Sequence, residues 1–321
     1  MTFIPPWLLS NRHVQTAFAG FPVIGATPER AIRKHRWIPL PDGDALHTVE
    51  LWHRSGVRRT AVLVHGLGGS TRSAYLQRAA RALFEAGHHV VGLDLRGAGL
   101  GAARSTKLYH AGIEPDVRVA LEHLGRDHRV RDLWLIGFSL GGQVSLFSAA
   151  RWGDTPPAGL RGVIGVCPPL DLAAASRRIE APRARPYLRY VMTSLIDGAV
   201  ALKRRLPDAL AVSERDLLRL TTIREYDERV IAPMHGFASA DAYYEACSAG
   251  PRLGDLRIEA HVIAAEDDPM VPGDTLKPWL DRASSVHAVW TAHGGHLGFV
   301  SRLGDGLWKT WANERIVQIV Q

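Results

Sequence analysis

The chain has 321 residues, of which 46% are hydrophobic and 22% are charged, and its formal net charge is +7. This length and composition predict a globular protein of one large or two ordinary domains, whose core needs neither disulfides nor a structural metal. Almost all of the positive charge is arginine, scattered along the chain without a long basic run or a basic stripe interleaved with aromatic residues. We therefore expect no nucleic-acid partner and at most weak association with a membrane surface.

The cysteines and the first residues of the chain predict the cellular compartment of the protein and whether it binds a metal. Cys167 and Cys247 have neither a CxxC partner nor a histidine at metal-ligand spacing, so we expect no metal site, no disulfide framework and no cofactor. The first residues lack the basic-then-apolar order of a signal peptide, and no stretch reaches the roughly 18 apolar residues of a membrane span. The predicted location is the cytoplasm.

Residues 1–30 contain several prolines with aromatic residues between them. Proline lacks a backbone N–H and restricts the residue before it, so this spacing predicts an extended arm on the body of the protein instead of a helix. We expect Trp7 to pack on that body, and Asn11 or His13 to cap a neighbouring element.

The following segments alternate between strand and helix patterns. Strands are predicted at Lys34–Pro39, Ala45–His53, Thr60–Val64, His89–Leu93, 132–136 and Val163–Val166, and helices at Ser73–Ala86, Pro115–Leu124 and 140–151. The first two strands flank a Pro-Asp-Gly-Asp turn, which is a hairpin signal. The alternation predicts an α/β fold: a mostly parallel, doubly wound sheet with helices on both faces, begun by an antiparallel N-terminal hairpin. In the loop after His89–Leu93, Asp94 and Arg96 predict a bracing salt bridge.

From Leu172 to about Ala246 no strand-like run occurs. The segment is helical, rich in arginine and amphipathic, with one apolar face predicted at Tyr187, Tyr190, Val191, Leu195, Ile196, Leu202 and Leu206. An insertion of this length between strands is usually functional, which indicates a lid over a cleft; a static helical cap is the alternative. We interpret its arginines as a solvated face in preference to a surface for anionic lipid.

Strand patterns resume at Arg257–Ala265 and Val286–Thr291, with a helix at Thr275–Ala283 between them. A closing amphipathic helix is then predicted from Leu307, Trp308, Trp311, Ile316 and Val317. The expected organisation is an N-terminal arm (1–30), the first part of the core (31–170), a helical cap (171–246) and the second part of the core (247–321).

The stretch Gly137-Phe138-Ser139-Leu140-Gly141 joins a buried strand to a helix. A Gly-x-Ser-x-Gly turn is too tight for a Cβ at Gly137 or Gly141, and it holds Ser139 in a strained position at the edge of the sheet. Ser139 is therefore the predicted nucleophile, and the N–H of Leu140 is expected to face a developing oxyanion. The alternative interpretation is a glycine-rich junction with an idle serine.

A second glycine-rich loop, His65-Gly66-Leu67-Gly68-Gly69, follows another buried strand. It lacks the Lys-Ser/Thr ending of a phosphate-binding loop. Before a Gly-x-Ser-x-Gly turn it is typical of the other half of an oxyanion hole, with the N–H of Leu67 as the donor. We expect His65 to be structural.

A serine nucleophile needs a base and an acid that orients the base. Both should follow strands, because the carboxyl ends of parallel strands meet at one edge of a sheet. His296, in a glycine-rich loop after the last predicted strand, is the predicted base, with His293 as a neighbour. Asp268 is the predicted acid; Asp267 is its nearest rival, and Asp171 is a second rival.

Together these motifs resemble the α/β-hydrolase superfamily over essentially the whole chain. The resemblance rests on His65-Gly66-x-Gly68-Gly69, Gly137-x-Ser139-x-Gly141-Gly142, Asp268-Pro269 and Gly295-His296. Within the superfamily the chain resembles the AB-hydrolase 4 (YheT-like) family, through Trp7…Asn11-x-His13-x-Gln15-Thr16, Leu95-Arg96-Gly97 and Tyr226-Asp227…Pro233…Gly236-Phe237…Tyr243-Tyr244. Tyr226 is a departure, since the family pattern has Phe before this Asp.

The resemblance implies hydrolysis of carboxylic esters, with related members acting on medium-chain esters, acylglycerols or phospholipids and some transferring acyl groups to alcohols. It also implies that Asp268 is the acid. The leading hypothesis is a serine carboxylesterase that cleaves short- to medium-chain acyl esters through an acyl-enzyme on Ser139, with a small acyl ester or lipid as its partner. The alternatives are an acyltransferase with the same triad and a non-catalytic ligand-binding protein on the same fold. The physiological substrate and the oligomeric state stay open.

Overall fold

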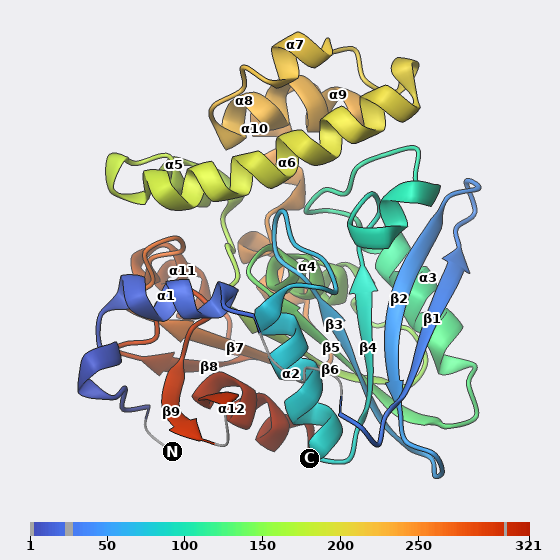
Figure 1. Cartoon of the computed structure of the whole chain (residues 1–321), viewed down its shortest axis with the longest axis vertical. Helices are drawn as coiled ribbons and strands as arrows, with labels where there is room; N and C mark the ends of the chain where they lie inside the picture. Colours follow the sequence, from blue (N-terminus) through green and yellow to red (C-terminus); the bar gives the residue numbers. More distant parts are fainter. Residues whose placement is uncertain (1–2, 23–27, 305–306) are drawn as a thin grey trace.

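An eight-stranded twisted sheet forms the centre of the computed structural model, which describes residues 3–22, 28–304 and 307–321 (Figure 1). Its strands are β1 (Ile32–Pro39), β2 (Ala45–Trp52), β3 (Arg58–Val64), β4 (His89–Asp94), β5 (Val130–Phe138), β6 (Leu160–Val166), β7 (Glu259–Ala265) and β8 (Val286–Thr291). Their order is β1-β2-β4-β3-β5-β6-β7-β8; β2 pairs antiparallel with both β1 and β4, and the other neighbours are parallel. The predicted mostly parallel sheet with an antiparallel hairpin is confirmed.

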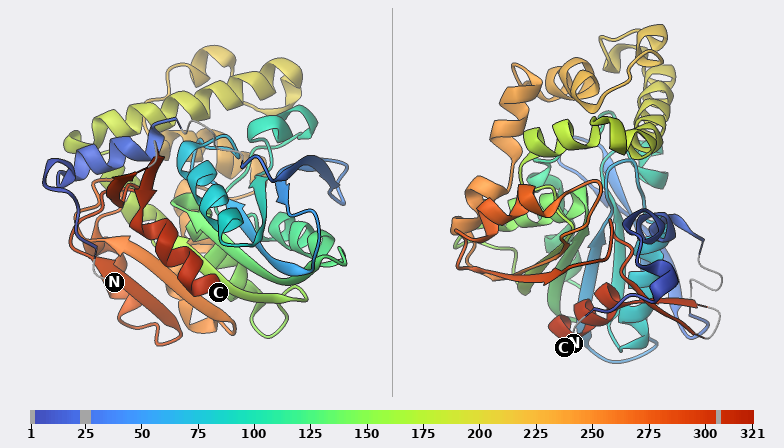
Figure 2. Two further views of the ribbon diagram at one scale, coloured as in Figure 1. Left: turned by 60° about the horizontal axis from the view of Figure 1, so that its bottom comes forward. Right: turned by 90° about the vertical axis from the view of Figure 1, so that its left-hand side faces the viewer.

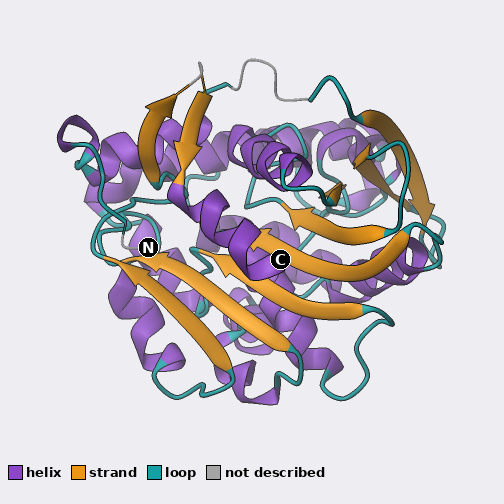
Figure 3. Ribbon diagram, turned by 90° about the horizontal axis from the view of Figure 1, so that it is seen from below, coloured by secondary structure: helices purple, strands orange, loops and turns teal. Residues whose placement is uncertain are grey.

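Helices cover both faces of the sheet (Figure 3). One face carries α2 (Ala74–Glu85) and α12 (Trp311–Val320), and the other carries α3 (Glu114–Gly125), α4 (Leu140–Trp152) and α11 (Gly273–Leu280). Successive side chains of a strand point to opposite faces, so Val62 and Val64 join one apolar cluster while Ala61 and Leu63 join the other. Burial on both faces explains why the central strands are continuous apolar runs in the sequence.

The segment between β6 and β7 contains only helices and turns. Apart from short 3-10 helices, the helices are α5 (Leu172–Ile179), α6 (Arg185–Arg205), α7 (Glu214–Leu217), α8 (Ile223–Tyr226), a π-helical turn (Asp227–Ile231), α9 (Ala232–His235) and α10 (Ala240–Cys247). Figures 1 and 2 show them as a layer above the edge where the parallel strands end. The apolar face of α6 is buried through Leu188, Val191 and Leu195, but Tyr190, predicted on that face, is 73% exposed.

The loop after β4 is braced by a buried guanidinium, as predicted. Arg96 makes ion pairs with Asp116 (2.8 Å) and Asp44 (2.6 Å), which come from separate elements. Asp94 has a different partner from the one expected: its Oδ2 lies 2.8 Å from Nδ1 of His47 on β2.

The expectation of an extended N-terminal arm without a helix is wrong. Helix α1 spans Arg12–Gly20, and the Asn11 side chain caps it by accepting a hydrogen bond from the backbone N–H of His13. The prolines flank this stretch without entering it. A favourable N-cap residue and an interior without proline therefore allow a helix to form here. Trp7, expected to pack, is 83% exposed. Residues 1, 2 and 23–27 of the predicted arm lie outside the described residues.

The closing helix is also shorter than predicted. Leu307 and Trp308 belong to β10 (Leu307–Thr310), which pairs antiparallel with β9 (Val300–Gly304). Helix α12 begins only at Trp311, because Thr310 has extended backbone and its hydroxyl accepts a hydrogen bond from the N–H of Asn313.

Candidate active site

Ser139 occupies a strained turn between β5 and α4. Its backbone angles are φ 52° and ψ −122°, a conformation that a non-glycine residue rarely adopts. A Cβ on Gly137 would collide with the backbone of Gly141, and one on Gly141 would collide with the carbonyl oxygen of His65. The predicted steric need for both glycines is confirmed.

Two backbone N–H groups beside Ser139 are available to a ligand. Leu140 begins α4, and Leu67 lies in the loop after β3; within the described ranges neither N–H meets a hydrogen-bond acceptor. The neighbours of Leu67 are held in place, since Gly66 donates to the Tyr75 hydroxyl (2.8 Å) and Gly68 donates to the Tyr109 hydroxyl (2.7 Å). The loop therefore presents the N–H of Leu67 on a fixed backbone.

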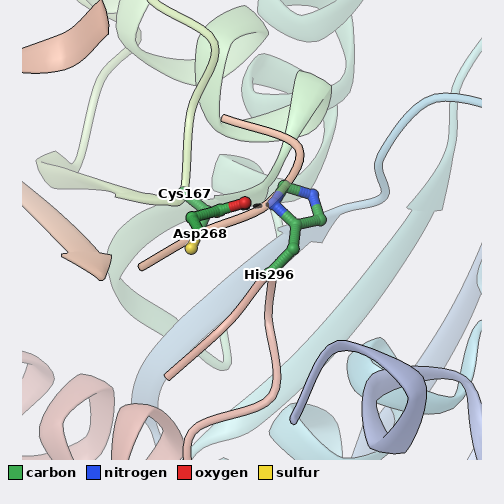
Figure 4. A group of neighbouring side chains, drawn as sticks. All are labelled: Cys167, Asp268 and His296. Atoms are coloured by element: carbon green, nitrogen blue, oxygen red, sulfur yellow. Dashed lines mark hydrogen bonds and ion pairs between the residues drawn. The ribbon is translucent and has the colours of Figure 1, made fainter. Parts of the chain in front are cut away.

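His296 and Asp268 form a buried hydrogen-bonded pair. Nδ1 of His296 lies 2.8 Å from Oδ2 of Asp268, and the two residues are 5% and 2% exposed (Figure 4). The other carboxylate oxygen of Asp268 accepts from the backbone N–H of Met270 (2.8 Å) and Val271 (2.9 Å). These bonds orient the carboxylate toward Nδ1 of His296, which favours the tautomer in which Nδ1 donates to Asp268 and Nε2 is the acceptor nitrogen.

Helix α1 holds the loop that carries His296, a role that the sequence analysis missed. The N–H of His296 donates to Oγ1 of Thr16 (2.9 Å), and the N–H of Val300 donates to Oε1 of Gln15 (2.8 Å). Side chains at Gly295 and Gly298 would collide with the α1 backbone, so these glycines permit the close approach. The Gln-Thr pair of the family motif was the only available signal.

The rival acids have structural partners instead. Asp267 accepts from the N–H of Gly295 (3.0 Å) and lies 3.4 Å from Nδ1 of His293, which is half exposed. Asp171 caps α5 by accepting from the N–H of Ala174 (2.8 Å). Of the three acids, only Asp268 is hydrogen-bonded to His296 in the part of the chain that the structure describes.

His65 is buried and hydrogen-bonded at both ring nitrogens. Its Nδ1 lies 2.8 Å from the carbonyl oxygen of Gly66, and its Nε2 accepts from the N–H of Leu95 (3.2 Å). Burial lowers the pKa of this imidazole. The predicted structural role of His65 is confirmed.

Cys167 adds a third side chain that the sequence analysis did not place here (Figure 4). Its sulfur lies within 4.8 Å of the bonded atoms of Asp268 and His296, at the end of β6. Cysteine, carboxylate and imidazole are metal donors, but a metal would compete for the two atoms that already bond each other. Burial raises the pKa of the thiol well above its ordinary value, which favours the protonated form of this side chain.

A cavity of about 310 Å³ lies beside the serine, the histidine and the two free N–H groups described above. Ser139, His296, Leu67 and Leu140 all line it from the core side. Much of its remaining wall comes from α1 and from the helical segment, including Leu172, Ile179, Val191, Ile223, Asp227, Tyr243 and Tyr244. A second cavity of about 210 Å³ adjoins it, and Leu67, Leu140, Asp227 and Tyr243 line both.

This fold, with a serine turn and an Asp–His pair at the carboxyl edge of its sheet, defines an α/β hydrolase. The family model described as the alpha/beta hydrolase fold matches residues 61–303, and the chain belongs to that family. Within it the chain is similar to YheT-like proteins: it is 29% identical to "Putative esterase YheT" of Escherichia coli, over 93% of this chain and 87% of the relative.

Two further comparisons extend the similarity. The chain is 24% identical to a monoacylglycerol lipase of Saccharomyces cerevisiae, over 77% of this chain and 56% of that protein. An esterase of Pyrococcus furiosus has the same fold, with a TM-score of 0.59 and 14% identity over 93% of this chain and 97% of that one. In the described residues no helix is long and apolar enough to cross a membrane.

Proposed function

We propose that the protein is a serine carboxylesterase that cleaves short- to medium-chain acyl esters through an acyl-enzyme on Ser139. The observation that carries the proposal is the 2.8 Å bond between His296 and Asp268 at the cavity that Ser139 also lines. Similarity to proteins named as an esterase and a monoacylglycerol lipase supports an ester bond as the target.

In the first half of the reaction, Oγ of Ser139 attacks the ester carbonyl carbon while Nε2 of His296 takes its proton. The carbonyl oxygen becomes an oxyanion that the N–H groups of Leu67 and Leu140 stabilise. The C–O bond to the alcohol then breaks, and His296 returns the proton to the departing alkoxide. Asp268 keeps the imidazole in the required tautomer and stabilises its cationic form.

In the second half, water attacks the acyl-enzyme while His296 accepts one of its protons. The second oxyanion collapses, the bond to Ser139 breaks, and the proton on His296 returns to Oγ. The products of this half are the free carboxylic acid and the regenerated serine. The mostly apolar wall from α5 and α6 is suited to an acyl chain, which supports short- to medium-chain esters.

Hydrolysis of a p-nitrophenyl ester series from acetate to palmitate tests this proposal. We expect a maximum at one chain length and loss of turnover in Ser139→Ala, leaving only the contribution of binding and the oxyanion donors. Ser284→Ala, an exposed serine outside the cavity, is the matched control. Near-wild-type turnover by Ser139→Ala would overturn the proposal. A folded wild type that is inactive and unlabelled by active-serine probes would support the non-catalytic alternative.

A second candidate function is acyl transfer from the same acyl-enzyme to an alcohol. The adjoining cavity of about 210 Å³ supports it, because an acceptor could bind there beside Leu67 and Leu140. Product analysis in water–alcohol mixtures separates the two functions. A fraction of ester product larger than the mole fraction of alcohol in the mixture favours the transferase. Free acid as the dominant product favours the hydrolase.

A further inference from the structure

Asp227 stands where the two cavities meet. It begins the π-helical turn Asp227–Ile231 that follows α8, and π-helical turns inside α-helical segments are frequent at functional sites. Only four residues line both cavities within the described chain: Asp227, Tyr243, Leu67 and Leu140. Asp227 and the residues of the proposed oxyanion donors therefore lie on the wall that the two cavities share.

The surroundings of Asp227 leave one of its oxygens without a partner. Oδ2 accepts a 2.7 Å hydrogen bond from the Tyr244 hydroxyl, whereas no donor among the described residues reaches Oδ1. The residue is 8% exposed and has no ion-pair partner in the described part of the chain. A buried carboxyl group without a cation is costly, and a polar group of this kind in a mostly apolar cavity is typical of ligand recognition.

Tyr243 supplies the complementary hydrogen-bonding group. Its hydroxyl oxygen accepts from the backbone N–H of Ala111 (2.8 Å), and among the described residues no acceptor takes its proton. Asp227 offers an acceptor and Tyr243 offers a donor, and both residues line the same two cavities. Together they match a group that both donates and accepts. A hydroxyl group has this capacity, while an alkyl chain has neither and a quaternary ammonium cannot accept.

We propose that Asp227, with Tyr243, is a specificity-determining residue that binds a hydroxyl group carried by the ester substrate. The inference rests on the proposed function, since it names the substrate class of the same site. Burial raises the pKa of Asp227 to about 7, so the group keeps or shares its proton near neutral pH. A neutral or half-ionised acid suits a hydroxyl better than a fixed cation.

The test compares esters that share a scaffold and differ in hydroxyl groups. Glycerol 1-monooctanoate places hydroxyls on the alcohol part, propyl 8-hydroxyoctanoate places one on the acyl part, and propyl octanoate has none. We expect wild type to have a higher kcat/KM for one hydroxylated ester than for propyl octanoate. In Asp227→Leu the ratio of kcat/KM for that hydroxylated ester to kcat/KM for propyl octanoate should fall about 10- to 100-fold.

Three variants make the result specific to the polar contacts of Asp227 and Tyr243. Asp227→Asn keeps polar atoms on the same scaffold and should retain most of the preference, and Tyr243→Phe should weaken it. Glu245→Gln removes an exposed carboxylate beside Tyr244 on α10 and should change nothing. Circular dichroism spectra and urea denaturation midpoints show whether each variant is folded.

Binding to Ser139→Ala separates this inference from the proposed function. Ligand-observed NMR with the same three esters should show the hydroxyl preference in Ser139→Ala and its loss in Ser139→Ala/Asp227→Leu, even if wild type hydrolyses none of them. Equal binding of the three esters, or an unchanged preference in the double variant, overturns the role of Asp227. A larger Asp227-dependent preference for octanoylcholine, a cation without a free hydroxyl, overturns the hydroxyl assignment.

Discussion

The backbone N–H of His296 donates a 2.9 Å hydrogen bond to the side chain of Thr16, which lies 280 positions earlier in the chain. Thr16 in turn donates to the carbonyl oxygen of Arg12, and His13 lies 2.7 Å from the Tyr187 hydroxyl on α6. Helix α1 thus contacts both the histidine loop and the helical layer above the sheet. Its orientation sets where the imidazole stands relative to Ser139.

Replacing Thr16 should impair turnover through the position of His296. Thr16→Val leaves the buried N–H of His296 without an acceptor, at a cost of about 1–3 kcal/mol, and the loop should shift to relieve it. We expect kcat to fall by about 100-fold with a smaller change in KM, since small displacements of a catalytic group are costly. Steady-state kinetics measures this split. Thr16→Ser, which keeps the hydroxyl, should restore kcat; a Thr16→Val enzyme with unchanged kcat would contradict the positioning role.

The proposed acid can be distinguished from its neighbour by isosteric substitutions. Asp268→Asn should reduce kcat by about 10⁴-fold, because an amide in place of the carboxylate favours the wrong imidazole tautomer. Asp267→Asn is the matched control, since Asp267 accepts from the N–H of Gly295 and contacts the half-exposed His293. Comparable losses in the two variants would argue against Asp268 as the orienting acid.

The elbow should tolerate no side chain at Gly141. Gly141→Ala places a Cβ against the backbone carbonyls of Val64 and His65, which cannot move without disturbing β3. We expect the free energy of unfolding to fall by about 3 kcal/mol or more, measured by urea denaturation. In Gly198→Ala the new Cβ meets open space within helix α6, so a gain of about 0.5–1 kcal/mol is expected. Similar stabilities of the two variants would contradict the packing argument.

Asp227 should make stability depend on pH in a defined direction. Its pKa is raised from the ordinary 3.8 to about 7, with burial as the main cause, so between these values the folded state binds a proton that the unfolded state has lost. The contribution of this group to stability is therefore full below about pH 4 and declines as the pH rises toward 7.

Asp227→Asn should remove that decline. As the pH rises from 4.5 to 7.5, we expect the unfolding free energy of Asp227→Asn to increase relative to that of wild type. Urea titrations at each pH measure both free energies. The exposed Glu245→Gln serves as the control with no such trend. A pH-independent difference between Asp227→Asn and wild type would show that the carboxyl group titrates normally.

Local patterns in the sequence determined most of the fold. Apolar runs such as Thr60–Val64 specify buried strands by themselves, and the Gly-x-Ser-x-Gly motif by itself predicts the strained turn at Ser139. The clash that requires glycine at position 141 comes from the carbonyl oxygens of Val64 and His65, which lie outside the motif. That an acid after β7 lies near His296 was also predictable, because both follow parallel strands whose carboxyl ends meet at one edge. Strand position alone did not separate Asp268 from Asp267, and the resemblance to the family favoured Asp268.

Only the tertiary structure decided which distant segments meet at that edge. Thr16 became the support of the His296 loop because α1 packs against Gly295 and Gly298, and no local pattern encodes that contact. Packing of remote segments buries Cys167 beside Asp268 and His296. It also places Asp227 on the wall of the cavity between the core and the helical segment. Periodicity and turn chemistry are properties of neighbouring residues, whereas burial, unpaired polar atoms and shared cavity walls arise only when remote parts of the chain pack together.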